Sequence, residues 1–171
     1  MPTNDLESRI VGDHHQALKL WLRLLACTTR VENVVRNRLR SEFATTLPRF
    51  DLLAQLEREP DGLTMGELSQ RLMVTGGNVT GITDQLEAEG LVRREAHPSD
   101  RRAFSVQLTP AGRRQFRRMA SVHEQWVIEL FAGWKTDEKT RVYNLLAALK
   151  QHLGSVDVQP VKRSKTKEKS A

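Results

Sequence analysis

Residues 64–108 read TMGELSQRLMVTGGNVTGITDQLEAEGLVRREAHPSDRRAFSVQL and open with a helix start signal. Thr64 and Glu67 have the spacing of a capping box, in which each side chain hydrogen-bonds the other residue's backbone N–H. A short helix is therefore expected from Thr64, followed by a break at 73–75. Apolar residues at helical spacing then predict a second helix over about 76–89.

Two strands are expected after this second helix. Gly90 should end the helix, because glycine readily adopts the left-handed conformation that follows many helix C-termini. Residues 91–95 predict a strand, and the alternation of apolar and polar residues over 103–108 predicts another. The charged segment 96–102 would join them as the tip of a hairpin. The side chains expected to face inward from the last strand are Phe104, Val106 and Leu108.

Helical patterns flank this stretch on both sides. One long helix is expected from His14 to about Phe43, and another starts at 45–48, where threonine and proline suit a first turn. Thr109-Pro110 starts a further helix in the same way, and Thr136 is expected to cap a last one. The sequence predicts a mainly α protein with a small β hairpin (α+β), made of a winged helix-turn-helix lobe and a helical dimerisation lobe. The expected division is 1–44 (N-terminal dimerisation helix), 45–109 (winged helix-turn-helix DNA-binding lobe), 110–154 (C-terminal dimerisation helices) and 155–171 (disordered basic tail).

The composition favours an anionic partner. The 171 residues carry a formal net charge of +6 and the pI is about 9.9, which suits nucleic acid, an anionic membrane surface or an anionic ligand. The single cysteine, Cys27, excludes a disulfide framework and a Cys-based zinc site within one chain. No apolar run has the form of a signal peptide or approaches the ~18 residues of a membrane span, so a cytoplasmic location is expected.

The helix over 76–89 has the two faces that a groove-reading helix needs. Val79, Ile82 and Leu86 lie on one side and are expected to pack inward. Asn78 and Gln85 can pair with adenine edges, and other small residues allow the backbone to approach DNA. The residues expected to face DNA are Thr75, Gly76, Gly77, Asn78, Thr80, Gly81, Asp84 and Gln85, with Thr75 at a helix N-terminus that can hold a phosphate.

The hairpin adds cations to this surface. Arg101 and Arg102 lie at its tip, with Arg93 and Arg94 at its base, and a tip arginine can enter a narrow minor groove. Asp100 could brace one of these guanidiniums. A charged tip and a polar helix face are also common on solvated surfaces, so it is their combination and order in a basic chain that favours DNA binding.

Residues 45–115 resemble the MarR family of transcriptional regulators. The resemblance is carried by Leu63–Leu68, Val79-Thr80, Asp84–Arg94, Asp100-Arg101-Arg102 and Val106–Gly112. It implies a homodimer that represses nearby genes until a ligand releases it from DNA. It further implies that Arg102 enters the minor groove and that Asp100 braces it. Gly81 departs from relatives that place a larger base-reading residue there.

A dimer also agrees with the apolar pattern of the flanking helices. The stripes on the first helix and on the last two are too wide for one small lobe to cover, and burying them is worth about 25 cal/mol per Å². Two-fold symmetry would then require a near-palindromic operator with half-sites about one helical turn apart.

An effector site is expected between the dimerisation helices and the DNA-binding lobe, where the resemblance implies one. Arg36 and Arg40 share a helix face, so with nearby aromatic residues they suit a small anionic aromatic ligand. The segment 47–53 weakly resembles relatives that sense aromatic acyl-CoA thioesters. Alternatively, these arginines are solvated or paired, for example with Glu32. The residues expected to line the site are Trp21, Phe50, Phe116 and Trp126 as walls and Arg36, Arg40 and Arg49 as cations.

Three alternatives stay open. A redox-sensing repressor would need an activated thiol at Cys27, whereas a buried, inert thiol is the favoured interpretation there. A non-specific architectural DNA-binding protein would rely on the basic residues 155–171. An enzyme is not expected, because no nucleophile elbow, phosphate loop or metal-binding helix motif is found. His123 is interpreted as a core or interface histidine, and neither a cofactor nor a metal is expected.

Overall fold

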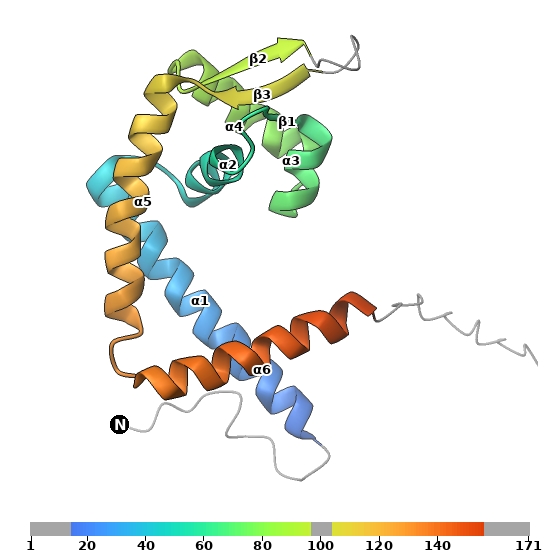
Figure 1. The fold of residues 1–171 in the computed structure, drawn as a ribbon, viewed down its shortest axis with the longest axis vertical. Helices are drawn as coiled ribbons and strands as arrows, with labels where there is room; N and C mark the ends of the chain where they lie inside the picture. Colours follow the sequence, from blue (N-terminus) through green and yellow to red (C-terminus); the bar gives the residue numbers. More distant parts are fainter. Residues whose placement is uncertain (1–14, 97–103, 156–171) are drawn as a thin grey trace, which may run out of the picture. The chain divides into compact units, whose positions relative to one another are not determined.

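The computed structural model describes residues 15–96 and 104–155, in two compact units that divide between Leu130 and Phe131. The first unit contains the helices α1 to α5 and the strands β1 to β3, and the second contains α6 (Figure 1). The elements are α1 Gln16–Phe43, α2 Leu47–Glu57, β1 Leu63–Thr64, α3 Met65–Leu72, α4 Gly76–Ala88, β2 Val92–Ala96, β3 Phe104–Leu108, α5 Pro110–Leu130 and α6 Thr136–Ser155. The mainly α fold with a small antiparallel sheet is the predicted one.

The sheet confirms the predicted hairpin and adds one strand to it. The strand order is β1-β3-β2, and both pairings are antiparallel. β1 was not predicted: its two residues, Leu63 and Thr64, lie opposite Val106 and Ser105 of β3. A strand this short cannot show the alternation of apolar and polar residues by which strands are recognised in a sequence.

One inward-facing prediction on β3 is wrong. Phe104 is 56% exposed, whereas its polar neighbour Ser105 is only 1% exposed. Phe104 is the first residue of β3 and pairs with Ala96, the last residue of β2, so it lies at the outer end of the hairpin, beyond the core that contains Val106 and Leu108. Val106 and Leu108 are buried, as predicted.

The core of the first unit draws buried side chains from all five of its helices and from the three strands. Helix α2 lies at its centre, since Leu52, Leu53 and Leu56 are at most 1% exposed. Burying a leucine side chain is worth about 1.5–3 kcal/mol. Helix α2 is therefore the scaffold on which α3, α4 and the sheet are held.

Local signals in the sequence place the ends of the helices. The capping box at α3 is confirmed, because the Thr64 N–H donates to Glu67 Oε2 at 2.8 Å and the Glu67 N–H donates to Thr64 Oγ1 at 3.3 Å. Gly90 has a φ of +69°, which is the left-handed conformation predicted for the residue that ends the second helix of the pair. Helix α1 is one continuous helix to Phe43.

A tight junction joins the end of α4 to the start of α5. The Thr109 hydroxyl donates to the Gly90 carbonyl at 2.7 Å and accepts from the Gly112 N–H at 3.0 Å. A Cβ on Gly112 would lie 1.9 Å from the Leu91 carbonyl oxygen, so only glycine allows the two backbones to come this close.

Helix α6 forms the second unit, and none of its residues is buried. Its predicted cap is off by one residue: the Lys135 N–H donates to Glu138 Oε2 at 2.7 Å, and the helix begins at Thr136. Large apolar side chains along it are exposed, including Tyr143, Leu145 and Leu153. Among the described residues, no helix combines the length and apolar character needed to cross a membrane.

Candidate nucleic-acid interface

Helices α3 and α4 form the predicted helix-turn-helix. Met73 follows α3 in the left-handed conformation, with a φ of 54°, and turns the chain. Thr75 is extended at the N-cap of α4, and its carbonyl accepts a hydrogen bond from the Val79 N–H at 3.2 Å. The Thr75 side chain makes no cap hydrogen bond, so it leaves the first-turn N–H groups of α4 to another acceptor, such as a phosphate.

The two faces of α4 are separated as predicted. Val79 and Leu86 are fully buried and Ile82 is half-buried. Thr83, which was not assigned to either face from the sequence, is also buried. Its hydroxyl donates a hydrogen bond to the Val79 carbonyl at 2.8 Å, so the buried polar group is satisfied. The residues predicted to face DNA are all exposed, namely Thr75, Gly76, Gly77, Asn78, Thr80, Gly81, Asp84 and Gln85.

The glycines on this face are not required by packing within the chain. A Cβ on Gly76, Gly77 or Gly81 would meet no heavy atom within 4 Å. Glycine costs roughly 1 kcal/mol relative to alanine in a helix interior. A close approach of another molecule to the α4 backbone would account for three such positions on one exposed face.

The carboxylates of α4 are engaged by arginines from other elements. Asp84 and Glu87 both bind the guanidinium of Arg94 on β2. The hydrogen bond that Arg94 donates to Asp84 makes the largest contribution to raising the pKa of Arg94, so this guanidinium remains charged. Asp84 therefore lies on the predicted face, with its carboxylate already bound within the protein. Arg94 was expected at the hairpin base, but its binding of the two acids was not predicted.

The base of the hairpin is well defined by its contacts. Arg93 is exposed; it donates to Gln107 Oε1 at 3.1 Å and pairs with Glu95 at 3.0 Å. The predicted tip residues Asp100, Arg101 and Arg102 lie outside the described residues.

Three of the four predicted aromatic effector residues lie in one cluster within the first unit. The ring centroids of Phe50 and Phe116 are 5.5 Å apart, and those of Phe50 and His123 are 5.0 Å apart. Trp126 joins through His123 at 6.2 Å. Burial lowers the pKa of His123, which favours its neutral form. Trp21 is 57% exposed on α1.

Two of the three arginines predicted to bind the effector, Arg36 and Arg49, have polar partners within the protein. Arg36 donates to Asn33 Oδ1 at 3.1 Å and lies 3.7 Å from Glu32, which is the alternative pairing expected above. Arg49 forms an ion pair with Glu89 at the C-cap of α4. Arg40 is exposed.

Asp51 on α2 has a shifted pKa that was not predicted from the sequence. Burial, with a smaller contribution from the charge of Glu32, raises the pKa of its carboxyl from 3.8 to about 6. Its sequence neighbours Phe50 and Leu52 are buried. The sequence does contain a sign of this burial, because Asp51 stands between two apolar residues of a predicted helix, Phe50 and Leu52.

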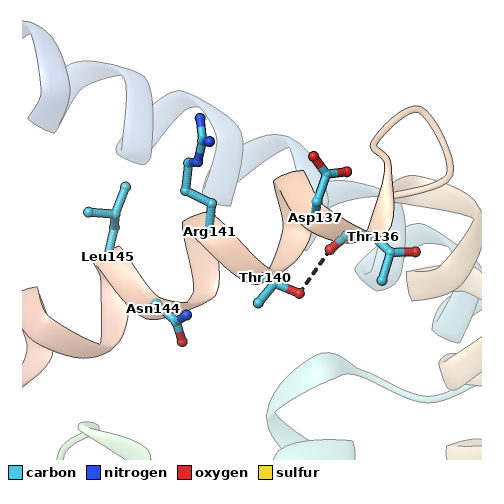
Figure 2. A pocket seen from close by; sticks show the side chains of 6 residues that line it. All are labelled: Thr136, Asp137, Thr140, Arg141, Asn144 and Leu145. Atoms are coloured by element: carbon cyan, nitrogen blue, oxygen red, sulfur yellow. Dashed lines mark hydrogen bonds between the residues drawn. The ribbon is translucent and has the colours of Figure 1, made fainter.

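Two hollows stand out on the described surface, and neither is lined by a predicted effector residue. One lies between the C-terminal turn of α1 and the start of α5, where Phe43, Arg114 and Arg118 contribute to its wall. The other follows one stretch of α6, where Thr140 donates to the Thr136 carbonyl at 2.9 Å (Figure 2).

The Cys27 thiol is exposed on α1, so the favoured interpretation of a buried thiol is wrong for this chain. It lies in the N-terminal half of α1, whose first buried residue is Val35. Within residues 15–96 and 104–155, no group of three or more His, Cys, Asp or Glu side chains is arranged to hold a metal ion.

Comparison with known proteins agrees with this geometry. Residues 45–103 match the MarR family. A MarR family transcriptional regulator from Silicibacter pomeroyi is 32% identical, with a TM-score of 0.71, over 84% of this chain and 99% of that one. The HTH-type transcriptional repressor YetL of Bacillus subtilis is 25% identical over 138 residues, or 80% of this chain and 82% of YetL. CouR from Rhodococcus jostii RHA1, crystallised with p-coumaroyl-CoA, shares the fold with a TM-score of 0.69 and 21% identity, over 82% of this chain and 95% of CouR.

Proposed function

The chain belongs to the MarR family of transcriptional regulators, and we propose that it is a repressor that binds a near-palindromic operator as a homodimer. The observation that carries this proposal is the division of α4 into a buried apolar face and an exposed face of small and polar residues. Such a helix fits the major groove of duplex DNA. The regulators it resembles are not enzymes, which agrees with the expectation from the sequence.

In this proposal the DNA contacts fall into two sets. The first turn of α4 holds a phosphate at Thr75, while Asn78 and Gln85 contact base edges. Arg102, braced by Asp100, enters the minor groove beside the wing, with Arg93 and Arg101 contacting the backbone. The bare backbone of the helix glycines allows α4 to lie deep in the groove.

Exposed apolar side chains support the homodimer. On the N-terminal half of α1, Leu18, Trp21 and Leu25 are 44–57% exposed. Along α6, Leu145 and Leu153 are 64% and 61% exposed. Exposed apolar patches of this kind mark interfaces in soluble proteins, and a second copy of the chain is the occupant that we propose.

Selection of duplexes from a random-sequence library, followed by footprinting, tests the DNA-binding proposal. We expect two protected half-sites about one helical turn apart. With roughly 6–10 phosphate contacts, the affinity should fall by about 10³- to 10⁵-fold between 50 and 200 mM salt. Absence of sequence preference would instead support a non-specific architectural protein, and a flat salt response would contradict both.

We further propose that the effector is a small anionic aromatic molecule, of which an aromatic acyl-CoA thioester is one form. The Phe50–Phe116–His123 cluster offers aromatic walls, and Arg36 and Arg40 lie one helical turn apart on α1. CouR, which has the same fold, binds a ligand of this type. Calorimetry with p-coumaroyl-CoA and with free p-coumarate tests the idea, and no heat from either would refute it.

The exposure of Cys27 favours one alternative response, in which oxidation of this thiol releases the DNA. Peroxide would then weaken operator binding by the wild-type protein but not by Cys27→Ser. Equal release of both proteins by peroxide would exclude Cys27 as the sensor.

A further inference from the structure

Helix α4 carries no positive side chain of its own. Residues 76–88 contain Asp84 and Glu87 but neither lysine nor arginine, and Glu89 follows at the C-cap. Carboxylates near the C-terminal end of a helix are disfavoured by the partial negative charge of that end. DNA phosphates would repel them further. Cations from neighbouring elements must therefore offset the charge of this helix.

Arg94 of β2 provides such a cation and binds both acids at once. Its guanidinium donates one hydrogen bond to Asp84 Oδ1 and another to Glu87 Oε2, the latter at 2.5 Å. The Arg94 backbone N–H also donates to Glu87 Oε1, at 3.1 Å. Glu87 thus holds the main chain and the side chain of the same strand residue.

These contacts of Arg94 with Asp84 and Glu87, called the Arg94 clamp below, restrict the rotation of α4 against β2. Asp84 and Glu87 are three residues apart, so their side chains lie on the same side of the helix. A guanidinium that forks between two carboxylates fixes direction as well as distance. Gln85, a predicted base contact, lies between the two acids in the sequence, so its orientation depends on the same clamp.

The neighbouring Arg93 has a different environment. Its side chain is 54% exposed, compared with 28% for Arg94. Its described partners, Glu95 and Gln107, both belong to the sheet and not to α4. The two adjacent arginines therefore divide into one that faces outward and one that is directed at the recognition helix.

We propose that Arg94 is a positioning residue for operator recognition: it neutralises Asp84 and Glu87 and holds α4 against β2 without itself contacting DNA. The inference rests on the proposed binding of DNA by α4. It assigns the adjacent arginines opposite roles, with Arg93 as a direct contact and Arg94 as an internal support.

A double-mutant cycle separates these roles. Arg94→Gln is compared in the wild-type background and in Asp84→Asn/Glu87→Gln, in which the acids it neutralises are absent. The probes are a duplex that the wild-type protein selects from a random library and a scrambled duplex of the same composition. Arg93→Gln, in both backgrounds, is the matched contrast, and thermal unfolding of every variant checks that it is folded.

We expect Arg94→Gln to weaken binding of the selected duplex by about tenfold or more in the wild-type background, and by less than about threefold where the acids are absent. Arg93→Gln should cost the same in both backgrounds and reduce the salt slope by about 0.9. If Arg94→Gln does not fold, Arg94→Lys, which keeps the charge but loses the fork, should show a smaller loss with the same background dependence.

An equal loss for Arg94→Gln in both backgrounds would overturn the inference and make Arg94 a direct DNA contact. Failure of the wild-type protein to select any duplex would overturn the proposed function itself, so the two failures are distinguishable.

Discussion

Arg49 on α2 forms an ion pair with Glu89, the residue at the C-cap of α4. Its sequence neighbour Phe50 packs against Phe116 and His123 of α5. Two consecutive residues of α2 thus contact the recognition helix and the aromatic cluster. Helix α2 therefore connects the proposed effector region with the recognition helix.

Replacing Arg49 should therefore affect the fold and DNA binding together. The Arg49 side chain is 16% exposed and that of Glu89 is 47% exposed, so Arg49→Ala removes the ion pair together with the packing of a largely buried side chain. We expect Arg49→Ala to lower the free energy of unfolding by about 1–3 kcal/mol in urea denaturation. Arg40→Ala, at an exposed position on α1, is the control and should change it by less than about 0.5 kcal/mol. Equal stability of the two variants would show that the ion pair contributes nothing.

The junction at Gly112 should tolerate no side chain. Because a Cβ there would lie 1.9 Å from the Leu91 carbonyl oxygen, one backbone must move to accommodate it. We expect Gly112→Ala to destabilise the protein by roughly 3 kcal/mol, measured by thermal or urea unfolding. Gly66→Ala, in α3, meets nothing within 4 Å and should be neutral or stabilising by up to about 1 kcal/mol. A stable Gly112→Ala protein would mean that the junction is looser than described.

Gly81 should show opposite effects on stability and on binding. The space beside it is open, so Gly81→Ala should stabilise α4 by about 0.5–1 kcal/mol. If the bare backbone approaches DNA, the same methyl should weaken operator binding by about tenfold, as measured by fluorescence anisotropy. Gly66→Ala supplies a control with the same chemical change away from α4. Unchanged affinity for Gly81→Ala would refute the close approach.

Asp51 should make stability depend on pH between about 4 and 6. Its pKa is raised from 3.8 to about 6 in the folded protein, so folding favours the protonated carboxyl. The stability this provides is present below the unfolded pKa and is lost as the pH rises through the folded one. Asp51→Asn should therefore be more stable than wild type by about 1–2 kcal/mol at pH 8, after allowance for solvent screening of a partly exposed group.

The two proteins should become equally stable as the pH falls below 3.8, because the Asp51 carboxyl is then protonated in the folded and the unfolded state. Urea denaturation over a pH series measures this difference directly. A wild-type protein that gains stability relative to Asp51→Asn as the pH rises would show that the carboxylate has a favourable partner after all.

The sequence predicted the helix-turn-helix well because its signals are local. The Thr64–Glu67 box and Gly90 act within a few residues of themselves, and both are found as predicted. The errors involve pairings between distant residues. β1 exists only because β3 lies beside it, and the Arg94 clamp depends on how β2 folds back onto α4. The pairing of Arg49 with Glu89 could not be predicted either, because nothing near Arg49 in the sequence points to Glu89.

The Thr109 junction has a mechanical consequence. The Thr109 hydroxyl donates to the carbonyl of Gly90, just after α4, and accepts from the N–H of Gly112 in the first turn of α5, so it ties these two helix ends together. In the proposed homodimer, a tilt of α5 would be carried over to α4 as a rigid lever. An effector would then need only to change the angle of α5 to alter the spacing of the two recognition helices, and so to put them out of step with the helical repeat of DNA.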